Sequence, residues 1–327
     1  MILLRRLLHG LQALWYQYVF FAFLAGRRRI APVRSEWEAQ PAAGARRARY
    51  LVLFAHYDAG GQVLGYVHEY LRQLRLLDAD IVFVSTAERL DEPALARLRE
   101  SCCRVIVREN SGYDFGSWKT ALQHGPSPEG YEALVITNDS VFGPARDLRP
   151  IVERMMAEPC DFWGITDSYE LFYHLQSYFV CFKPAVFRSP AFARFWERYP
   201  FTHHKRFAIW NGEVRLTQAL KRAGFTPGAA CPYAGIRVAL EGRSTRELAF
   251  TVYALLNYHR GGHPNPTHFF WDSLLLRNDM PFLKKELVLD NPMRVKNLGE
   301  IPAVLKAVGP YPYELVAEAL RRRAASG

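Results

Sequence analysis

The chain has 327 residues, of which 50% are hydrophobic and 23% are charged, so it can bury a large core and is not intrinsically disordered. Its formal net charge is +10, but residues 1–49 hold nine arginines and two acids, and the remainder is nearly neutral. This distribution, without zinc-finger spacing or an aromatic RNA-binding signature, argues against a nucleic-acid-binding protein. Five cysteines without C-x-x-C spacing argue against a disulfide framework and favour a cytosolic globular part.

Residues 1–30 predict a membrane-associated helix. The segment from Leu3 to Leu24 is apolar and aromatic, lies between arginine clusters at 5–6 and 27–29, and has one polar face. This pattern favours an amphipathic helix in the membrane interface, with a spanning helix or a helix docked on the protein's own core as alternatives. Residues 31–48 mix proline, alanine, glycine and charge without periodicity, which predicts a linker.

From residue 49 onward, short apolar runs alternate with amphipathic segments. The predicted strands cover residues 50–55, 80–85, 104–107, 133–137 and 161–165, with a further strand through residues 174–178 of the aromatic segment 171–182. The predicted helices cover residues 63–76, 92–102, 116–123, 148–157, 191–197 and 213–223. This order indicates a Rossmann-like α/β domain over 49–292, a mostly parallel sheet flanked by helices, with a helical tail at 293–327. Ligands of such sheets bind at the carboxyl ends of the strands.

The first of these strands ends in polar residues and a glycine pair. His56, Tyr57 and Asp58 precede Gly60-Gly61 at the start of a helix, an arrangement typical of nucleotide sites. A helix cap and turn is the structural alternative. The chain has neither a Walker phosphate loop nor G-x-G-x-x-G after a strand, which argues against ATP hydrolysis and dinucleotide redox chemistry.

The third strand runs into a dense polar segment at the start of a helix. Gly112 permits close backbone approach, Asn110 and Asp114 are suited to sugar hydroxyls, and Lys119 is suited to a diphosphate. We assign these residues, together with Tyr113, to donor binding. For Asp114, a helix cap is the alternative.

The fourth strand delivers Asn138 and Asp139 to its carboxyl end. We assign Asn138 to the donor, and Asp139 is a hard oxygen ligand of the kind that Mg²⁺ or Mn²⁺ prefers when bridging a substrate diphosphate. Such a cation would neutralise charge on the leaving nucleoside diphosphate. An Asx turn before Gly143-Pro144 is the alternative.

Two further groups predict the acceptor side of a site. Glu213 is placed at the start of a helix, where it could deprotonate an acceptor hydroxyl, although the helix dipole also favours an acid there. His174, Gln176 and Tyr178 alternate within a predicted strand, so their side chains share one face that could line the acceptor site.

Five stretches together resemble the rhamnan-synthesis protein F family, glycosyltransferases of the GT-A type that act in rhamnose-containing polysaccharide and O-antigen assembly. These stretches are FAHYD at 54–58, ENSGYDFGSWK at 109–119, ITNDSVFGP at 136–144, HLQSYFVCF at 174–182 and PFLKKELVLDNP at 281–292.

The resemblance implies transfer of a sugar, rhamnose from a dTDP-activated donor, to a growing glycan or lipid-linked acceptor at the cytoplasmic face of the bacterial inner membrane. It places Asn138-Asp139-Ser140 at the Asp-x-Asp metal motif, with one carboxylate fewer. It makes Glu213 the catalytic base, with Val214 in place of an aspartate, and His268 a downstream metal ligand, for which a core histidine is the alternative. A non-catalytic assembly subunit and a metal-dependent nucleotide-sugar hydrolase remain rival functions.

Overall fold

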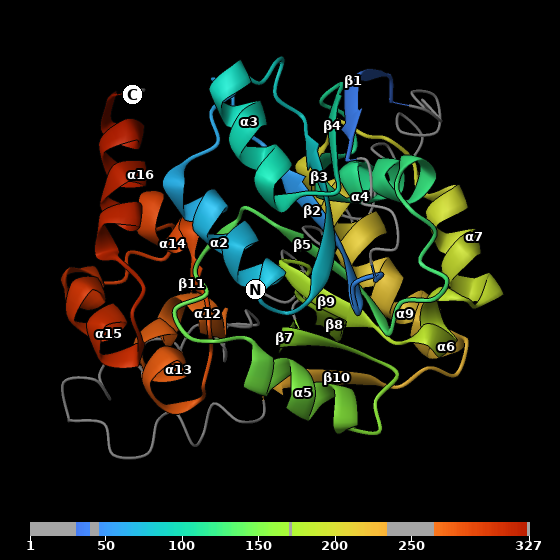
Figure 1. Cartoon of the computed structure of the whole chain (residues 1–327). Helices are drawn as coiled ribbons and strands as arrows, with labels where there is room; N and C mark the ends of the chain where they lie inside the picture. The colour runs from blue at the N-terminus through green and yellow to red at the C-terminus, as the bar shows by residue number, and fades with distance from the viewer. Residues whose placement is uncertain (1–30, 40–45, 170–171, 234–264, 326–327) are drawn as a thin grey trace, which may run out of the picture.

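Four strands with nearly continuous apolar side chains form the parallel centre of the sheet: β2 (Tyr50–His56), β3 (Ala79–Ser85), β4 (Arg104–Arg108) and β5 (Ala133–Asn138). They lie in the order β4-β3-β2-β5, and all three pairings are parallel. The connecting helices are α2 (Gly65–Arg75), α3 (Glu92–Ser101) and α4 (Tyr113–His124) (Figure 1). The structure, a computed structural model, describes residues 31–39, 46–169, 172–233 and 265–325.

The sheet continues beyond β5 with strands of mixed direction. β9 (Phe179–Phe182) is antiparallel to β5 and to β7 (Phe162–Ser168), β10 (Pro227–Cys231) is parallel to β7, and β8 (His174–Leu175) pairs antiparallel with β7. The prediction of an α/β fold with a mostly parallel central sheet is confirmed.

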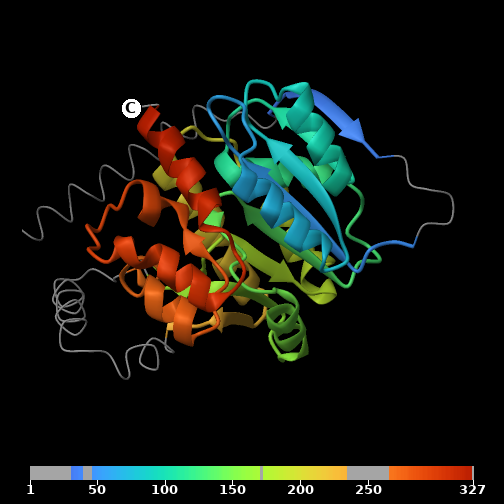
Figure 2. The ribbon, with the colours of Figure 1, turned by 60° about the vertical axis from the view of Figure 1, so that its left-hand side comes forward.

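Helices cover both faces of the sheet, as Figure 2 shows. Alternate residues of β2 point to opposite faces, because Val52 and Phe54 belong to one apolar cluster and Leu51 and Leu53 to the other. The first cluster is closed by α2, α3, α5 (Arg149–Ala157), α13 (Trp271–Arg277), α15 (Ile301–Val308) and α16 (Tyr313–Ala325). The second is closed by α4, α6 (Pro184–Phe187), α7 (Pro190–Arg198) and α9 (Arg215–Arg222).

The predicted linker contains an edge strand, so that prediction is wrong for residues 33–38. β1 (Val33–Glu38) pairs antiparallel with β4 and completes that side of the sheet. Val33 and Trp37 are partly buried, and Arg104 of β4 binds the carboxylates of Glu36 and Glu38. An exposed edge strand needs no continuous apolar run, because backbone hydrogen bonds to its neighbour hold it.

Two predicted elements near the site differ in detail. The aromatic segment predicted to hold one strand contains β8 and β9, with Gln176 and Tyr178 in the turn between them. The predicted helix at 213–223 begins earlier, because α8 (Lys205–Ala208) runs directly into the π-helix η1 (Ile209–Val214) and then α9. Glu213 therefore lies inside a helix, and the helix dipole does not explain its place.

The C-terminal elements pack against the first half of the chain. They are α12 (Pro266–Phe269), β11 (Leu283–Lys284), α14 (Lys285–Leu289), η3 (Leu298–Glu300), α15 and α16, and α16 contacts α2.

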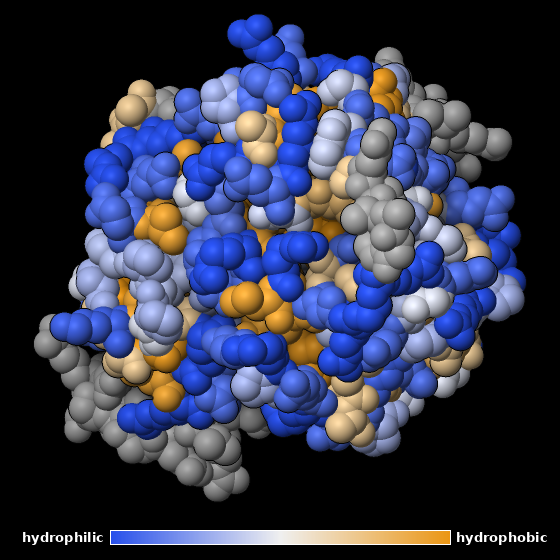
Figure 3. Space-filling view, viewed as in Figure 1, coloured by the Kyte–Doolittle hydropathy of each residue, from blue (hydrophilic) through white to orange (hydrophobic). Residues whose placement is uncertain are grey.

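The face seen in Figure 3 is mainly hydrophilic, with small apolar areas between polar side chains. Within the described ranges, no helix combines the length and the hydropathy needed to cross a membrane. The helix predicted for residues 1–30 lies outside the described residues.

Candidate active site

The strand order reverses between β2 and β5, at the place known as the crevice of an open α/β sheet. From β2 the chain builds β3 and β4 on one side and then returns to place β5 on the other, which is the point where α/β sheets bind ligands. His56 ends β2, and Asn138, which pairs with Ala55, ends β5. His56 is buried, its Nδ1 lies 3.1 Å from the hydroxyl of Ser85, and burial lowers its pKa against the opposing charge of Asp139.

A distant segment joins the crevice through a two-stranded sheet. β11 pairs antiparallel with β6 (Val141–Phe142), which sets Lys284 opposite Val141. The backbone N–H of Lys285 donates to the carbonyl of Ser140 at 2.9 Å. Two lysines therefore lie beside the end of β5. Sequence-based prediction missed both, although they stand in the PFLKKELVLDNP stretch, because a lysine pair has no local signature for a site.

Asp139 is engaged by an ammonium and a phenol. Its Oδ2 accepts a hydrogen bond from Lys285 Nζ at 2.7 Å and from the Tyr66 hydroxyl at 3.2 Å. The same ammonium donates to the Tyr66 hydroxyl at 2.8 Å. Because the Asp139 side chain is only 9% exposed, this ion pair is shielded from water and stronger than a surface pair. Tyr66, from α2, was also missed.

Asp114 lies close to this group. The amide of Asn138 donates to its Oδ2 at 2.8 Å, while the Asn138 carbonyl oxygen accepts from the backbone and hydroxyl of Ser140. Burial and the charge of Asp139 raise the pKa of Asp114 to about 6, against the hydrogen bond from Asn138 and the positive charge of Lys285. The structure thus brings three of the predicted residues, Asp114, Asn138 and Asp139, into one cluster.

We expect Asp114→Asn to change the pH dependence of stability. An acid whose pKa rises from 3.8 to about 6 on folding binds its proton more tightly in the folded state, so its contribution to stability falls as pH rises between these values. Asparagine does not titrate, so the variant does not undergo this decrease. Relative to the wild type, its free energy of unfolding should rise by about 2–3 kcal/mol between pH 4 and pH 7. Urea unfolding across this range measures it. A difference that is the same at pH 4 and pH 7 would contradict the assignment.

Glu213 is linked to this cluster by its electrostatic interaction with Lys284. Its Oε1 accepts a hydrogen bond from the backbone N–H of Ser177, and its Oε2 lies 4.0 Å from His174 Nε2. Gln176 instead accepts from the hydroxyl of Thr166 at 2.6 Å, so its carbonyl oxygen is held inside the sheet. The geometry brings His174 to the predicted base and leaves Gln176 in a packing position.

Lys284 lies among three acids. Its ammonium is 4.0 Å from the ring centre of Tyr178 and interacts electrostatically with Glu213, Glu286 and Asp114. Burial lowers the pKa of Lys284 to about 8, against the raising effect of these carboxylates. The ammonium is therefore mainly protonated at neutral pH.

Three residues predicted to bind the donor make hydrogen bonds within the protein. Lys119 Nζ donates to the carbonyls of Glu197 and Tyr199 at 2.9 and 2.8 Å, which caps the end of α7. Asp58 accepts from the backbone of Gly60 and Gln62 and from Arg322 of α16. The Tyr113 hydroxyl donates to the carbonyl of His203. Tyr57 and Asn110 are exposed.

A buried arginine shapes the loop before α4. Arg108 donates five hydrogen bonds, to the carbonyls of Glu109, Ser111 and Tyr113 and twice to the hydroxyl of Ser117. Gly112 has φ +77°, and a Cβ there would lie 2.7 Å from the Phe201 ring, so glycine is required. The loop therefore places Asp114 through the Arg108 side chain, which sequence-based prediction did not identify.

The predicted metal ligands do not form one site. Asp139 is paired with Lys285, whereas His268 Nε2 lies 3.9 Å from the carboxylate of Glu286. Burial, with the charge of Lys284, lowers the pKa of His268 to about 4, so it is neutral at pH 7. In the described part of the chain, no three histidine, cysteine or acidic side chains are placed to hold a metal ion together. This donor set does not fit the divalent cation expected from the sequence.

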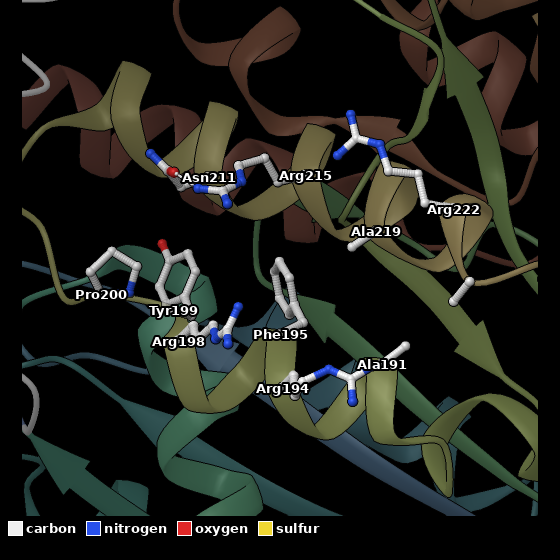
Figure 4. A pocket seen from close by; sticks show the side chains of 11 residues that line it. Ala191, Arg194, Phe195, Arg198, Tyr199, Pro200, Asn211, Arg215, Ala219 and Arg222 are labelled. Atoms are coloured by element: carbon white, nitrogen blue, oxygen red, sulfur yellow. Dashed lines mark hydrogen bonds between the residues drawn. The ribbon is translucent and has the colours of Figure 1, made fainter.

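A hollow of about 380 Å³ lies elsewhere, between α7 and the η1–α9 helix (Figure 4). Arginines line both of its walls: Arg194 and Arg198 on α7, Arg215 and Arg222 on α9. Asn211 and Arg215, four residues apart, share the helix face toward this hollow, and Glu213 between them lies on another face. None of the described residues predicted for the site lines it, so we place the candidate site at the strand ends.

The fold and the strand-end cluster define an α/β protein with a group of buried polar side chains at the topological switch point of its sheet. Residues 81–229 match the family model described as rhamnan synthesis protein F. The resemblance drawn from the short stretches is thereby confirmed for this part of the chain, which contains Asp114, Asp139 and Glu213.

Two curated proteins are similar in sequence to parts of this chain. Virulence protein VirA of Vibrio anguillarum is 30% identical over 209 residues, which cover 60% of this chain and 65% of VirA. The uncharacterized protein y4gN of Sinorhizobium fredii is 31% identical over 153 residues, covering 44% of this chain and 39% of that protein. The match thus spans less than two thirds of either relative.

Solved structures show only distant likeness. A structure described as a nucleotide-diphospho-sugar transferase of Desulfovibrio desulfuricans is 17% identical, with a TM-score of 0.34, and the match covers 65% of this chain and 96% of that one. A mannosyltransferase of Pyrobaculum calidifontis, in complex with GDP-Man and Mn²⁺, is 15% identical, with a TM-score of 0.35, and the match covers 96% of this chain and 87% of that one.

Proposed function

We propose that this chain is a glycosyltransferase that moves a sugar from a nucleotide-sugar donor to a hydroxyl of a glycan or lipid-linked acceptor. The observation that carries the proposal is the convergence of Asp114, Asp139, Glu213 and two lysines at the switch point of the sheet. Four separate segments supply these side chains, and three of them fall within the family match. Polar groups gathered from distant segments in a crevice are typical of a catalytic site.

The reaction in this proposal is a single displacement. The donor lies across the carboxyl ends of β2 and β5, with its diphosphate toward the lysines. The Glu213 carboxylate takes the proton from the acceptor hydroxyl, and the acceptor oxygen forms a bond to the anomeric carbon. The bond from that carbon to the diphosphate oxygen breaks, and the nucleoside diphosphate leaves with the electron pair. The hydrogen bond from the Ser177 N–H holds one oxygen of Glu213, and the other oxygen, 4.0 Å from His174 Nε2, is the one that takes the proton.

The family description, rhamnan synthesis, supports a sugar of the rhamnose class and a polysaccharide product. We therefore propose dTDP-rhamnose as the donor to test first. Calorimetric titration with dTDP-rhamnose, UDP-glucose and GDP-mannose, followed by mass spectrometry of reactions with glycan acceptors, tests the proposal. A new glycosidic product with stoichiometric release of nucleoside diphosphate is the expected result.

The same assay separates the rival functions. Release of free sugar at a rate independent of acceptor would show a hydrolase, because the same acids could activate water. Binding of a donor without turnover would show a non-catalytic subunit of polysaccharide assembly. Absence of binding to every nucleotide sugar would remove the proposed function.

The proposal includes attachment to the cytoplasmic face of the bacterial inner membrane through residues 1–30. The amphipathic pattern of that segment supports it, because such helices bury an apolar face between lipid headgroups. We expect the full chain to sediment with membranes and a chain lacking residues 1–30 to remain in the supernatant. Equal membrane binding by both would contradict the anchor.

A further inference from the structure

Lys284 and Lys285 form a lysine pair beside Asp139 at the end of β5. The pairing of β11 with β6 holds Lys284 opposite Val141, and Lys285 is bound through its backbone to Ser140. Both residues are therefore fixed beside the end of β5 by main-chain hydrogen bonds. Side chains held on rigid elements in this way can present charge to a ligand without large ordering costs.

Lys285 stands at the Asp139 carboxylate itself. Its ammonium lies 2.7 Å from Oδ2, within the space that a metal ion bound to Asp139 would share. The Lys285 side chain is 25% exposed, so its ammonium is not closed off from the crevice. An ammonium has three donors, and Lys285 gives hydrogen bonds to Asp139 and Tyr66, which leaves capacity for a further acceptor.

Lys284 has more hydrogen-bonding capacity to spare. Among the described residues, its ammonium has no hydrogen-bond acceptor, and its close contact is the ring of Tyr178. The ammonium nevertheless interacts electrostatically with the carboxylates of Glu213 and Asp114, which come from different segments of the site. An ammonium is a compact point charge that phosphate oxygens bind readily.

We propose that Lys284 and Lys285 bind the diphosphate of the nucleotide donor directly and supply the positive charge that a divalent cation would otherwise bring. The inference rests on the proposed function and changes its cofactor requirement. Two ammonium groups carry the same formal charge as one divalent ion. Of the two predicted metal ligands, Asp139 forms an ion pair with Lys285, and the His268 ring lies beside the carboxylate of Glu286. The two ligands therefore do not face one another.

Calorimetric titration of the full chain tests the role of the lysine pair. The ligands are dTDP, UDP and GDP, and the affinity of each is compared with that of the corresponding nucleoside monophosphate. The titrations are made in EDTA and again in Mn²⁺. We expect the preferred diphosphate to bind equally well in both buffers, within about twofold. Lys284→Met should weaken the binding of that diphosphate by about tenfold or more, which corresponds to roughly 1.4 kcal/mol, and should reduce the preference over the monophosphate.

Two further variants sharpen the result. Lys285→Arg keeps the charge next to Asp139 and should bind more tightly than Lys285→Met, which guards against a simple folding defect. Lys306→Met, on the exposed face of α15, is the matched control and should bind as the wild type does. Binding that requires Mn²⁺ and is unaffected by Lys284→Met would overturn the lysine pair and leave the transferase function standing. Absence of nucleotide binding by the wild type in both buffers would overturn both.

Discussion

Glu213→Gln is expected to lower the rate of sugar transfer by about 10²- to 10⁴-fold, the range in which a general base contributes. The glutamine retains the oxygen that accepts the Ser177 N–H, so the turn before β9 keeps its hydrogen bond. It lacks the ability to take the acceptor proton and the negative charge that interacts with Lys284. Loss of that negative charge does not weaken the attraction of Lys284 for a diphosphate, so donor affinity should not fall while kcat does. Initial-rate kinetics with calorimetric donor titration measure the two effects separately.

The matched control for this substitution is Glu197→Gln. Glu197 is an exposed acid on α7, and its side chain is outside the strand-end cluster. This variant should keep the wild-type rate. If Glu213→Gln also turns over within threefold of the wild type, Glu213 is not the base. A fall in donor affinity without a fall in kcat would instead make Glu213 a donor contact.

Arg108→Met is expected to remove about 3–5 kcal/mol from the free energy of unfolding. The guanidinium is fully buried and satisfies the carbonyls of Glu109, Ser111 and Tyr113. A methionine fills part of the space but cannot donate, so the buried carbonyl of Ser111 and the hydroxyl of Ser117 lose their guanidinium donor, while the carbonyl of Glu109 keeps the hydrogen bond from the Ser111 N–H. Because the same carbonyls shape the loop before Asp114, donor binding should be lost even at temperatures where the variant remains folded. Urea unfolding followed by circular dichroism measures the destabilisation.

Arg99→Met provides the comparison for Arg108. Arg99 pairs with Glu92 on the surface of α3, where both side chains are substantially exposed. Water and salt screen such a pair, so its loss should change stability by less than about 1 kcal/mol. Equal destabilisation by the two substitutions would show that the buried hydrogen bonds of Arg108 do not support the loop.

Elements that are specified by their own side-chain pattern were predicted well, whereas elements that are specified by backbone pairing with a neighbour were not. β2, β3, β4 and β5 were predicted within one or two residues, because strands buried on both faces must be apolar throughout. β1 was missed because an edge strand is specified by backbone pairing with β4. Glu213 was placed at a helix start because the π-helix η1, which contains it, has no side-chain pattern that marks it.

The candidate site divides in the same way. Asp114, Asn138 and Asp139 were identified because polar residues that directly follow apolar strands are visible in the order of the residues. Lys119 was assigned to a diphosphate from its place near these residues, but its side chain turns toward the end of α7. Direction along a helix decides such an assignment, and it depends on which neighbours pack against each face.

The sequence by itself determined the α/β class, the order of the central elements, the family resemblance and the edge of the sheet at which polar groups gather. These properties are local, because hydrophobic period and strand-end composition depend on neighbouring residues. Only the tertiary structure decided that Lys284 and Lys285 join Asp139, since 145 positions separate Asp139 from Lys284 and their meeting depends on the pairing of β11 with β6. Charge complementarity between segments so far apart has no local sequence pattern, and it becomes visible once the chain is folded.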